Sequence, residues 1–126
     1  MNYKGVIIAE SLKDQTVLNS LHNLKARREK VTPKHNTPWL TQWTLHTVEI
    51  PENNMDTIAK QLSESIETTH SAWYIDFKNQ EFHYIIFPHK VFKINVLKKE
   101  SYKDARMYGS SLGIPSYQMQ FERLKR

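Results

Sequence analysis

Strand-forming residues are concentrated in three segments of the chain. Residues 3–8 and 41–50 are rich in β-branched and aromatic residues. Residues 72–94 alternate apolar and polar positions, with a two-residue turn at 79–80 and a second turn at 88–90. These segments predict a sheet that includes a three-stranded meander over 72–94.

The turn at 79–80 sets a register for the first hairpin of this meander. It pairs Phe77 with Phe82 and places Asp76 directly across from His83 on the other face. We expect the apolar side to be the core face, since a slip of one residue would scatter its members. These members are Trp73, Ile75, Phe77, Phe82, Tyr84, Ile86, Phe92 and Ile94.

Helical periodicity is clearest after residue 53. Met55, Ile58, Ala59, Leu62 and Ile66 recur at the spacing of one helix face, which predicts an amphipathic helix packed on the sheet.

Two further helices are predicted from capping-box spacing. Ser11 and Asp14 open one to about residue 21, and Ser101 and Asp104 open another that ends before Gly113. Two segments stay ambiguous. Residues 24–31 extend the first helix or form a polar edge strand, and 116–124 form a helix (Tyr117, Phe121 and Leu124 on one side) or a strand.

The order of elements predicts one α+β domain over residues 1–126. We expect a mainly antiparallel sheet of about five strands, with helices packed chiefly on one face. The 126 residues include no apolar run near 18 residues, and the start lacks the pattern of a secretory signal. With no cysteine, disulfides, thiolate catalysis, zinc fingers and iron–sulfur clusters are excluded. We therefore expect a cytoplasmic protein without a membrane partner.

Charge is unevenly distributed around the net value of +5. Residues 1–38 carry seven basic and three acidic side chains, 39–89 two basic and seven acidic, and 90–126 nine basic and three acidic. The basic ends are either solvated separately or meet in one cationic face that attracts nucleic acid, nucleotides or an acidic partner.

A basic and aromatic segment carries the first functional hypothesis. The charged candidates for anion binding are Arg27, Arg28, Lys30 and Lys34, and Trp39 is the candidate for stacking. The structural alternative is that Trp39 closes the edge of the core and Trp43 is buried in the sheet.

The second hypothesis concerns Asp76 and His83. A carboxylate beside an imidazole fixes its tautomer and raises its basicity, so His83 oriented by Asp76 is a candidate general base. The alternative is a cross-strand polar pair on a wet face. His46 would join them if its strand neighbours the hairpin, but no metal-ligand spacing is present, and we predict neither a metal nor a cofactor.

The segments TPWLTQWTLHTVEIP, WYIDFKN, HYIIF and GIPSYQ resemble a group of small uncharacterised bacterial proteins. The resemblance covers most of the chain and implies a bacterial source, but it implies no activity, ligand or site residue.

Three functions are consistent with these observations. The first is a non-catalytic binding module for an anionic ligand (a nucleotide or nucleic-acid segment) or an acidic protein surface, with Arg27, Arg28, Lys30, Lys34, Trp39 and His46 as binding candidates. The second is a small hydrolase or isomerase that uses His83 and Asp76. The third is an interaction protein that pairs with itself or a partner through a sheet edge.

Overall fold

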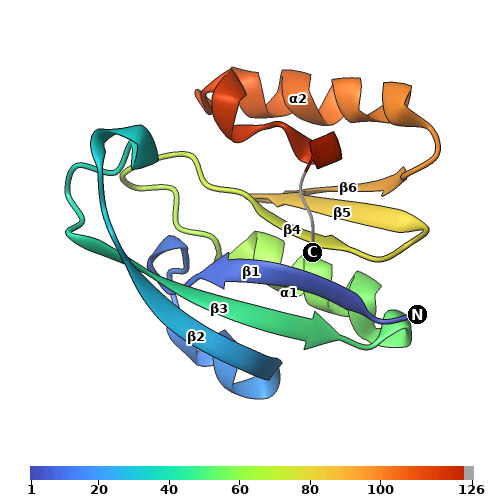
Figure 1. Cartoon of the computed structure of the whole chain (residues 1–126), viewed down its shortest axis with the longest axis horizontal. Coiled ribbons are helices and arrows are strands. Elements are labelled where there is room, and N and C mark those ends of the chain that lie inside the picture. Colours follow the sequence, from blue (N-terminus) through green and yellow to red (C-terminus); the bar gives the residue numbers. More distant parts are fainter. Residues whose placement is uncertain (124–126) are drawn as a thin grey trace.

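A computed structural model describes residues 1–123 and shows a six-stranded antiparallel sheet with two α-helices (Figure 1). The strands are β1 (Tyr3–Ile8), β2 (His22–Lys30), β3 (Gln42–Ile50), β4 (Ile75–Lys78), β5 (Phe82–Phe87) and β6 (Lys90–Asn95). The helices are α1 (Met55–Ser65) and α2 (Tyr102–Ser111). The order of the strands in the sheet is β2-β3-β1-β4-β5-β6. The predicted α+β class and the meander are confirmed, but the sheet has six strands rather than five.

The additional strand is β2, which lies at one edge of the sheet. Its side chains are almost all exposed, and within residues 1–123 it pairs only with β3. Charged residues suit an edge strand because they discourage pairing with other chains.

The helix predicted from residue 11 is wrong: 3-10 turns occupy Ala9–Ser11 and Gln15–Ser20. Asp14 caps the second turn, its carboxylate accepting the backbone N–H of Thr16 at 2.9 Å.

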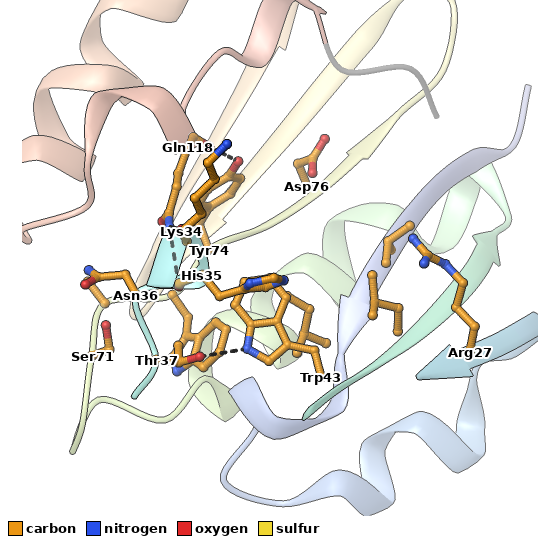
Figure 2. A pocket seen from close by; sticks show the side chains of 15 residues that line it. Arg27, Lys34, His35, Asn36, Thr37, Trp43, Ser71, Tyr74, Asp76 and Gln118 are labelled. Carbon is orange, nitrogen blue, oxygen red and sulfur yellow. Dashed lines mark hydrogen bonds between the residues drawn. The ribbon is translucent and has the colours of Figure 1, made fainter. Parts of the chain in front are cut away.

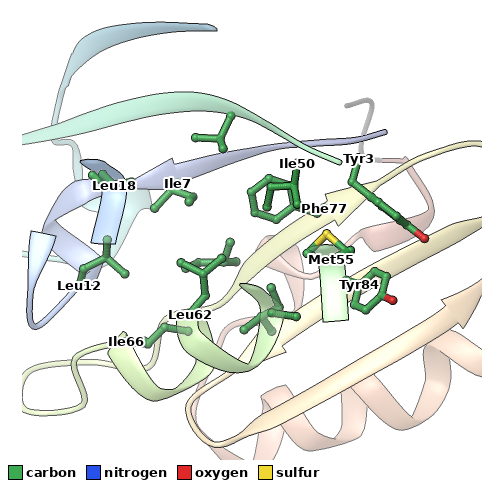
Figure 3. Packing of buried hydrophobic residues seen from close by; sticks show 14 of the residues in the cluster. Tyr3, Ile7, Leu12, Leu18, Ile50, Met55, Leu62, Ile66, Phe77 and Tyr84 are labelled. Atoms are coloured by element: carbon green, nitrogen blue, oxygen red, sulfur yellow. The ribbon is translucent and has the colours of Figure 1, made fainter. Parts of the chain in front are cut away.

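The helix α1 covers one face of the sheet. Its apolar side matches the predicted periodicity, with Met55, Ala59, Leu62 and the adjacent Ile66 all buried. Figure 3 shows these side chains meeting residues of β1, β3, β4 and β5, among them Phe77. Burial of large apolar side chains contributes about 1.5–3 kcal/mol each, which makes this cluster the main core.

The helix α2 covers the opposite face, so the expectation that the helices share one face is wrong. Along β5, Tyr84 and Ile86 belong to the cluster under α1, whereas Ile85 and Phe87 pack with Tyr102 of α2. Successive side chains of a strand point to opposite faces. The two clusters therefore lie on opposite sides of β5, as in Figure 1. Neither helix within residues 1–123 combines the length and apolar character needed to cross a membrane.

The hairpin registers differ from the predicted ones. Phe77 pairs with Tyr84, not Phe82, so the first turn lies at 80–81 and the register is shifted by two residues. A shift of two preserves the face of every side chain.

The β5–β6 turn has two residues, Pro88 and His89, and His89 adopts a positive φ of 59°. Phe92 and Ile94 therefore pack on the α2 side, not on the predicted core face.

The segment after α2 closes the second core cluster. Gly113 follows the helix with φ of +92°, a left-handed conformation that suits glycine, as predicted. The tail is neither the predicted helix nor a strand, since it forms 3-10 turns at Ser116–Gln118 and Phe121–Arg123. Met119 and Phe121 are buried against α2, and Leu124 lies outside the described residues.

Candidate ligand-binding pocket

A pocket of about 400 Å³ lies on the α2 side of the sheet, over the strands that α2 does not cover. Val6 and Ile8 of β1 and Leu45 of β3 contribute its apolar surface. Figure 2 shows Arg27 on one side of this space, the segment 34–37 on the other, and Asp76 entering from β4. Segments far apart in the sequence therefore form one concave site.

The turn at 33–37 is held by its own side chains. The backbone N–H of Thr32 donates to Nδ1 of His35 at 2.9 Å, and Nε2 of His35 lies 3.3 Å from Glu29. Trp43 packs edge-on against the His35 ring, and its Nε1–H donates to the buried Thr37 hydroxyl at 3.0 Å. These contacts fasten the turn to β2 and β3, which gives the pocket a rigid wall.

The C-terminal segment braces the same turn from outside. The hydroxyl of Tyr117 donates to the Lys34 carbonyl at 2.9 Å, and the side-chain amide of Gln118 donates to the same oxygen at 3.2 Å. The Tyr74 hydroxyl donates to the Gln118 carbonyl. Three separate parts of the chain, 32–37, 71–74 and 116–118, thereby meet at the pocket rim.

The segment before β4 is anchored by Trp73. Its indole N–H donates to Glu67 at 2.8 Å, and its ring lies 5.6 Å from that of Trp43. Burial alone would raise the pKa of the Glu67 carboxyl, but hydrogen bonds from Trp73 and from the backbone N–H groups of His70 and Thr69 lower it instead. Glu67 therefore stays ionised and holds the loop together.

Two of the predicted basic residues, Arg27 and Lys34, line the pocket. Arg27 of β2 is the cross-strand partner of Leu45 of β3. Its guanidinium lies 3.8 Å from the Glu29 carboxylate, and an exposed ion pair of this kind contributes little to stability. Arg28 and Lys30 alternate with Arg27 along β2, so they belong to the opposite face and do not line the pocket.

Trp39 and His46 lie elsewhere. Trp39 is partly exposed and stacks on His70, with ring centroids 5.2 Å apart, where it joins two loops outside the pocket. His46 pairs with the buried Ile7, on the α1 side of the sheet. Its strand β3 is separated from β4 by β1, so His46 does not join Asp76 and His83.

Asp76 and His83 do meet, although not as direct cross-strand partners. His83 pairs with Lys78, and its Nε2 reaches diagonally to Oδ2 of Asp76 at 2.7 Å. Its Nδ1 lies 2.8 Å from the hydroxyl of Tyr102 on α2. The pair is buried under α2, with His83 0% and Asp76 2% exposed, so the wet-face alternative is wrong.

The chemistry of the three groups sets the direction of these hydrogen bonds. A carboxylate only accepts, so Nε2–H of His83 donates to Asp76, and the Tyr102 hydroxyl is hydrogen-bonded to Nδ1 on the other side of the ring. Burial, together with the nearby Glu122 and Asp76 charges, raises the pKa of Tyr102 to about 12, which keeps its hydroxyl protonated as a donor. Both ring nitrogens of His83 are thus engaged, and only Asp76 of the three lines the pocket.

The basic strands β2 and β6 lie at opposite edges of the sheet. The basic residues of β2 lie at one edge of the sheet, whereas Lys90 and Lys93 lie on β6 at the other. Lys93 sits over the ring of Phe82 at 4.5 Å from its centroid. Both edges of the sheet are therefore cationic, but they do not form one continuous face.

Some pocket residues could not be found from the sequence. Thr37, Tyr74 and Gln118 belong to no recognisable sequence motif. They line the pocket because segments distant in the sequence come into contact there. Tyr102 was expected only as part of a helix, and it reaches His83 because α2 packs on β5. Residues 1–123 contain no group of three His, Cys, Asp or Glu side chains arranged to hold a metal ion.

Comparison with known proteins adds no constraint, since no family model, curated protein or solved structure matches the chain at a significant level.

Proposed function

We propose that this protein is a non-catalytic binding module for a small organic anion, held in the pocket between β1–β3 and the 33–37 turn. The observation that carries the proposal is that Arg27 and Lys34 border a concave, largely apolar and aromatic site. Ligand pockets typically enclose 300–1,000 Å³ and combine apolar walls with a few polar groups, and about 400 Å³ falls within this range.

Charge and rigidity both support an anion as the ligand. A guanidinium binds carboxylates and phosphates with two parallel hydrogen bonds, and the exposed ion pair with Glu29 costs little to replace. The braced turn keeps the backbone at Lys34 in place before binding. Because the turn is already ordered, binding a ligand costs little further conformational entropy, which favours affinity.

The same geometry gives less support to a nucleic-acid surface. Arg28 and Lys30 belong to the other face of β2, and the lysines of β6 lie at the far edge. A backbone-binding surface needs several cations along one path. A pocket ligand uses Arg27 and Lys34 without the others.

The two alternatives are also less well supported. A general base must lie within hydrogen-bonding reach of its substrate, and His83 is enclosed, with both nitrogens engaged. Pairing through a sheet edge would have to overcome the charged residues on β2 and β6, which oppose it.

The test uses calorimetric titration with phenylacetate, 4-hydroxyphenylacetate, AMP and GMP. We expect at least one of these anions to bind, and Arg27→Ala to weaken that binding about tenfold or more, since it removes a charged hydrogen-bond donor. Arg28→Ala is the matched control, because it removes the same charge from the same strand on the other face. We expect it to change affinity less than twofold.

Two outcomes would contradict the proposal. One is the absence of binding by all four anions at 5 mM. The other is an equal loss of affinity in Arg27→Ala and Arg28→Ala, which would mean that β2 attracts anions by its overall charge and not through the pocket.

A further inference from the structure

We infer that the outer edge of β2 is an interaction surface for an extended acidic segment of another protein, which adds to the sheet as a further strand. This inference is independent of the pocket and of the proposed function. It rests on two observations. The side chains of β2 are almost all exposed, with no strand on its outer side within residues 1–123, and most of its charged side chains are basic.

The ladder between β2 and β3 shows which backbone groups of β2 face outward. The N–H of Val31 donates to the Thr41 carbonyl at 3.1 Å, and this pair continues the β2–β3 register. In an antiparallel ladder, hydrogen-bonded and non-hydrogen-bonded pairs alternate. Counting back from Val31, the N–H and C=O groups of Lys30, Arg28 and Ala26 therefore point away from β3.

Thr44 supports this alternation from the β3 side. It is the cross-strand partner of Arg28, but its N–H donates to the Glu10 carboxylate at 2.6 Å and not to β2. Arg28 and Thr44 are thus a non-hydrogen-bonded pair. Outward-facing backbone groups recur at every second residue from 26 to 30, which is the spacing that an added strand bonds.

The outward-facing groups lie in a regular part of the strand. The shift in the β2–β3 register falls between Asn23 and Lys25, before these residues. Residues 25–30 contain neither a proline nor a shift in register, which are two of the features that block pairing at a sheet edge. Charge is therefore the feature that decides which strand can pair here.

The charge pattern of this segment favours an acidic partner. Residues 25–30 carry one acidic side chain, Glu29, which already lies 3.3 Å from His35. The basic side chains of the segment are Lys25, Arg27, Arg28 and Lys30. Like charges directly opposite each other on paired strands are destabilising, so β2 of a second copy would be repelled. The same side chains would attract an extended segment with acidic residues at alternate positions, opposite Arg28 and Lys30.

The test uses an octapeptide of alternating threonine and glutamate with blocked ends, and two N-methylated forms of it with the same charge. A glutamate opposite Arg28 bonds through its own N–H, whereas the threonine N–H groups face away from β2. We expect the parent peptide to bind at 1 mM or below. N-methylation of the glutamates should weaken binding about tenfold or more, and N-methylation of the threonines should change it less than threefold. These comparisons use the unmodified protein, so they do not depend on whether a variant folds.

Amide hydrogen exchange locates the added strand. With the parent peptide bound, we expect slower exchange at the N–H groups of Ala26, Arg28 and Lys30. The N–H groups of Arg27 and Glu29 already bond to β3, so their exchange should not change.

Arg28→Glu tests the role of charge. It places a like charge opposite a glutamate of the peptide, and we expect binding to weaken about fivefold. Lys90→Glu is the matched control, because it makes the same change of charge on β6 at the opposite edge of the sheet. We expect it to change affinity less than twofold.

Four outcomes would overturn the inference. They are no binding of the parent peptide at 1 mM, equal binding of the two N-methylated peptides, slowed exchange without alternation along 26–30, and equal weakening by Arg28→Glu and Lys90→Glu. Displacement of the peptide by an equal concentration of octathymidylate would also contradict it, because the edge would then recognise a nucleic-acid polyanion and not a strand. None of these outcomes bears on the pocket, which the small anions test separately.

Discussion

The buried hydrogen-bond chain Tyr102–His83–Asp76 predicts an unequal response to removing its members. His83→Ala would leave the Asp76 carboxylate, which is 2% exposed, without the donor at 2.7 Å. A hydrogen bond to a charged group contributes about 1.5–3 kcal/mol to the free energy of unfolding, and removing its donor inside the protein costs at least that much. Tyr102→Phe removes only a hydroxyl from the far end of the chain, and we expect it to cost about 1 kcal/mol.

Equilibrium unfolding in urea, followed by circular dichroism, measures both costs on one scale. Because small domains have only about 5–15 kcal/mol of stability, the His83→Ala protein should unfold at much lower urea concentration than the Tyr102→Phe protein. The native far-ultraviolet spectrum before unfolding serves as the control for folding. A His83→Ala cost no greater than that of Tyr102→Phe would refute the reasoning, because it would show that Asp76 does not depend on His83.

Two further predictions concern the strand contact beside Asp76 and the ionisation of Tyr102. A Cβ at Gly5 would lie 2.2 Å from the carbonyl oxygen of Asp76, so Gly5→Ala should force β1 and β4 apart. We expect it to lower the free energy of unfolding by about 1–3 kcal/mol, which urea unfolding measures as a lower midpoint. An unchanged midpoint would be inconsistent with this contact. The pKa of Tyr102 is raised to about 12 from 10.0, so the folded protein binds its proton more tightly, and stability should fall as pH rises from about 10 to 12. Tyr102→Phe should show a smaller fall over this interval in urea unfolding at each pH, and an identical fall would contradict the assignment.

Much of the fold follows from local patterns. The periodicity from Met55 to Ile66 predicts α1 because that helix has one apolar face and one wet face. The meander has two covered faces, so its pattern identifies strands but not which side is the core. The number of residues in a turn then determines which face of the sheet the following side chains occupy. The β5–β6 turn has two residues instead of the predicted three, so Phe92 and Ile94 lie on the α2 side.

The candidate site was only partly predictable for the same reason. Of the predicted basic residues, Arg27 and Lys34 line the pocket, whereas alternation along β2 places Arg28 and Lys30 on the other face. The sequence left this segment undecided between strand and helix, so it could not separate the two sets. Asp76 and His83 are in contact although the predicted register was wrong, because a shift of two residues leaves each side chain on the same face of the sheet. The braces from Tyr117 and Gln118 join residues more than 80 positions apart, which no local pattern encodes.

We expect the anion to bind in the pocket and not along either cationic edge of the sheet. The most direct measurement is a titration with 4-hydroxyphenylacetate, followed by amide chemical shifts in two-dimensional nuclear magnetic resonance spectra. We predict that the largest changes map to β2 at Arg27, the turn at 34–37 and β4 at Asp76. Changes centred on Lys90, Lys93 and the rest of β6, or no changes at 5 mM ligand, would contradict the account.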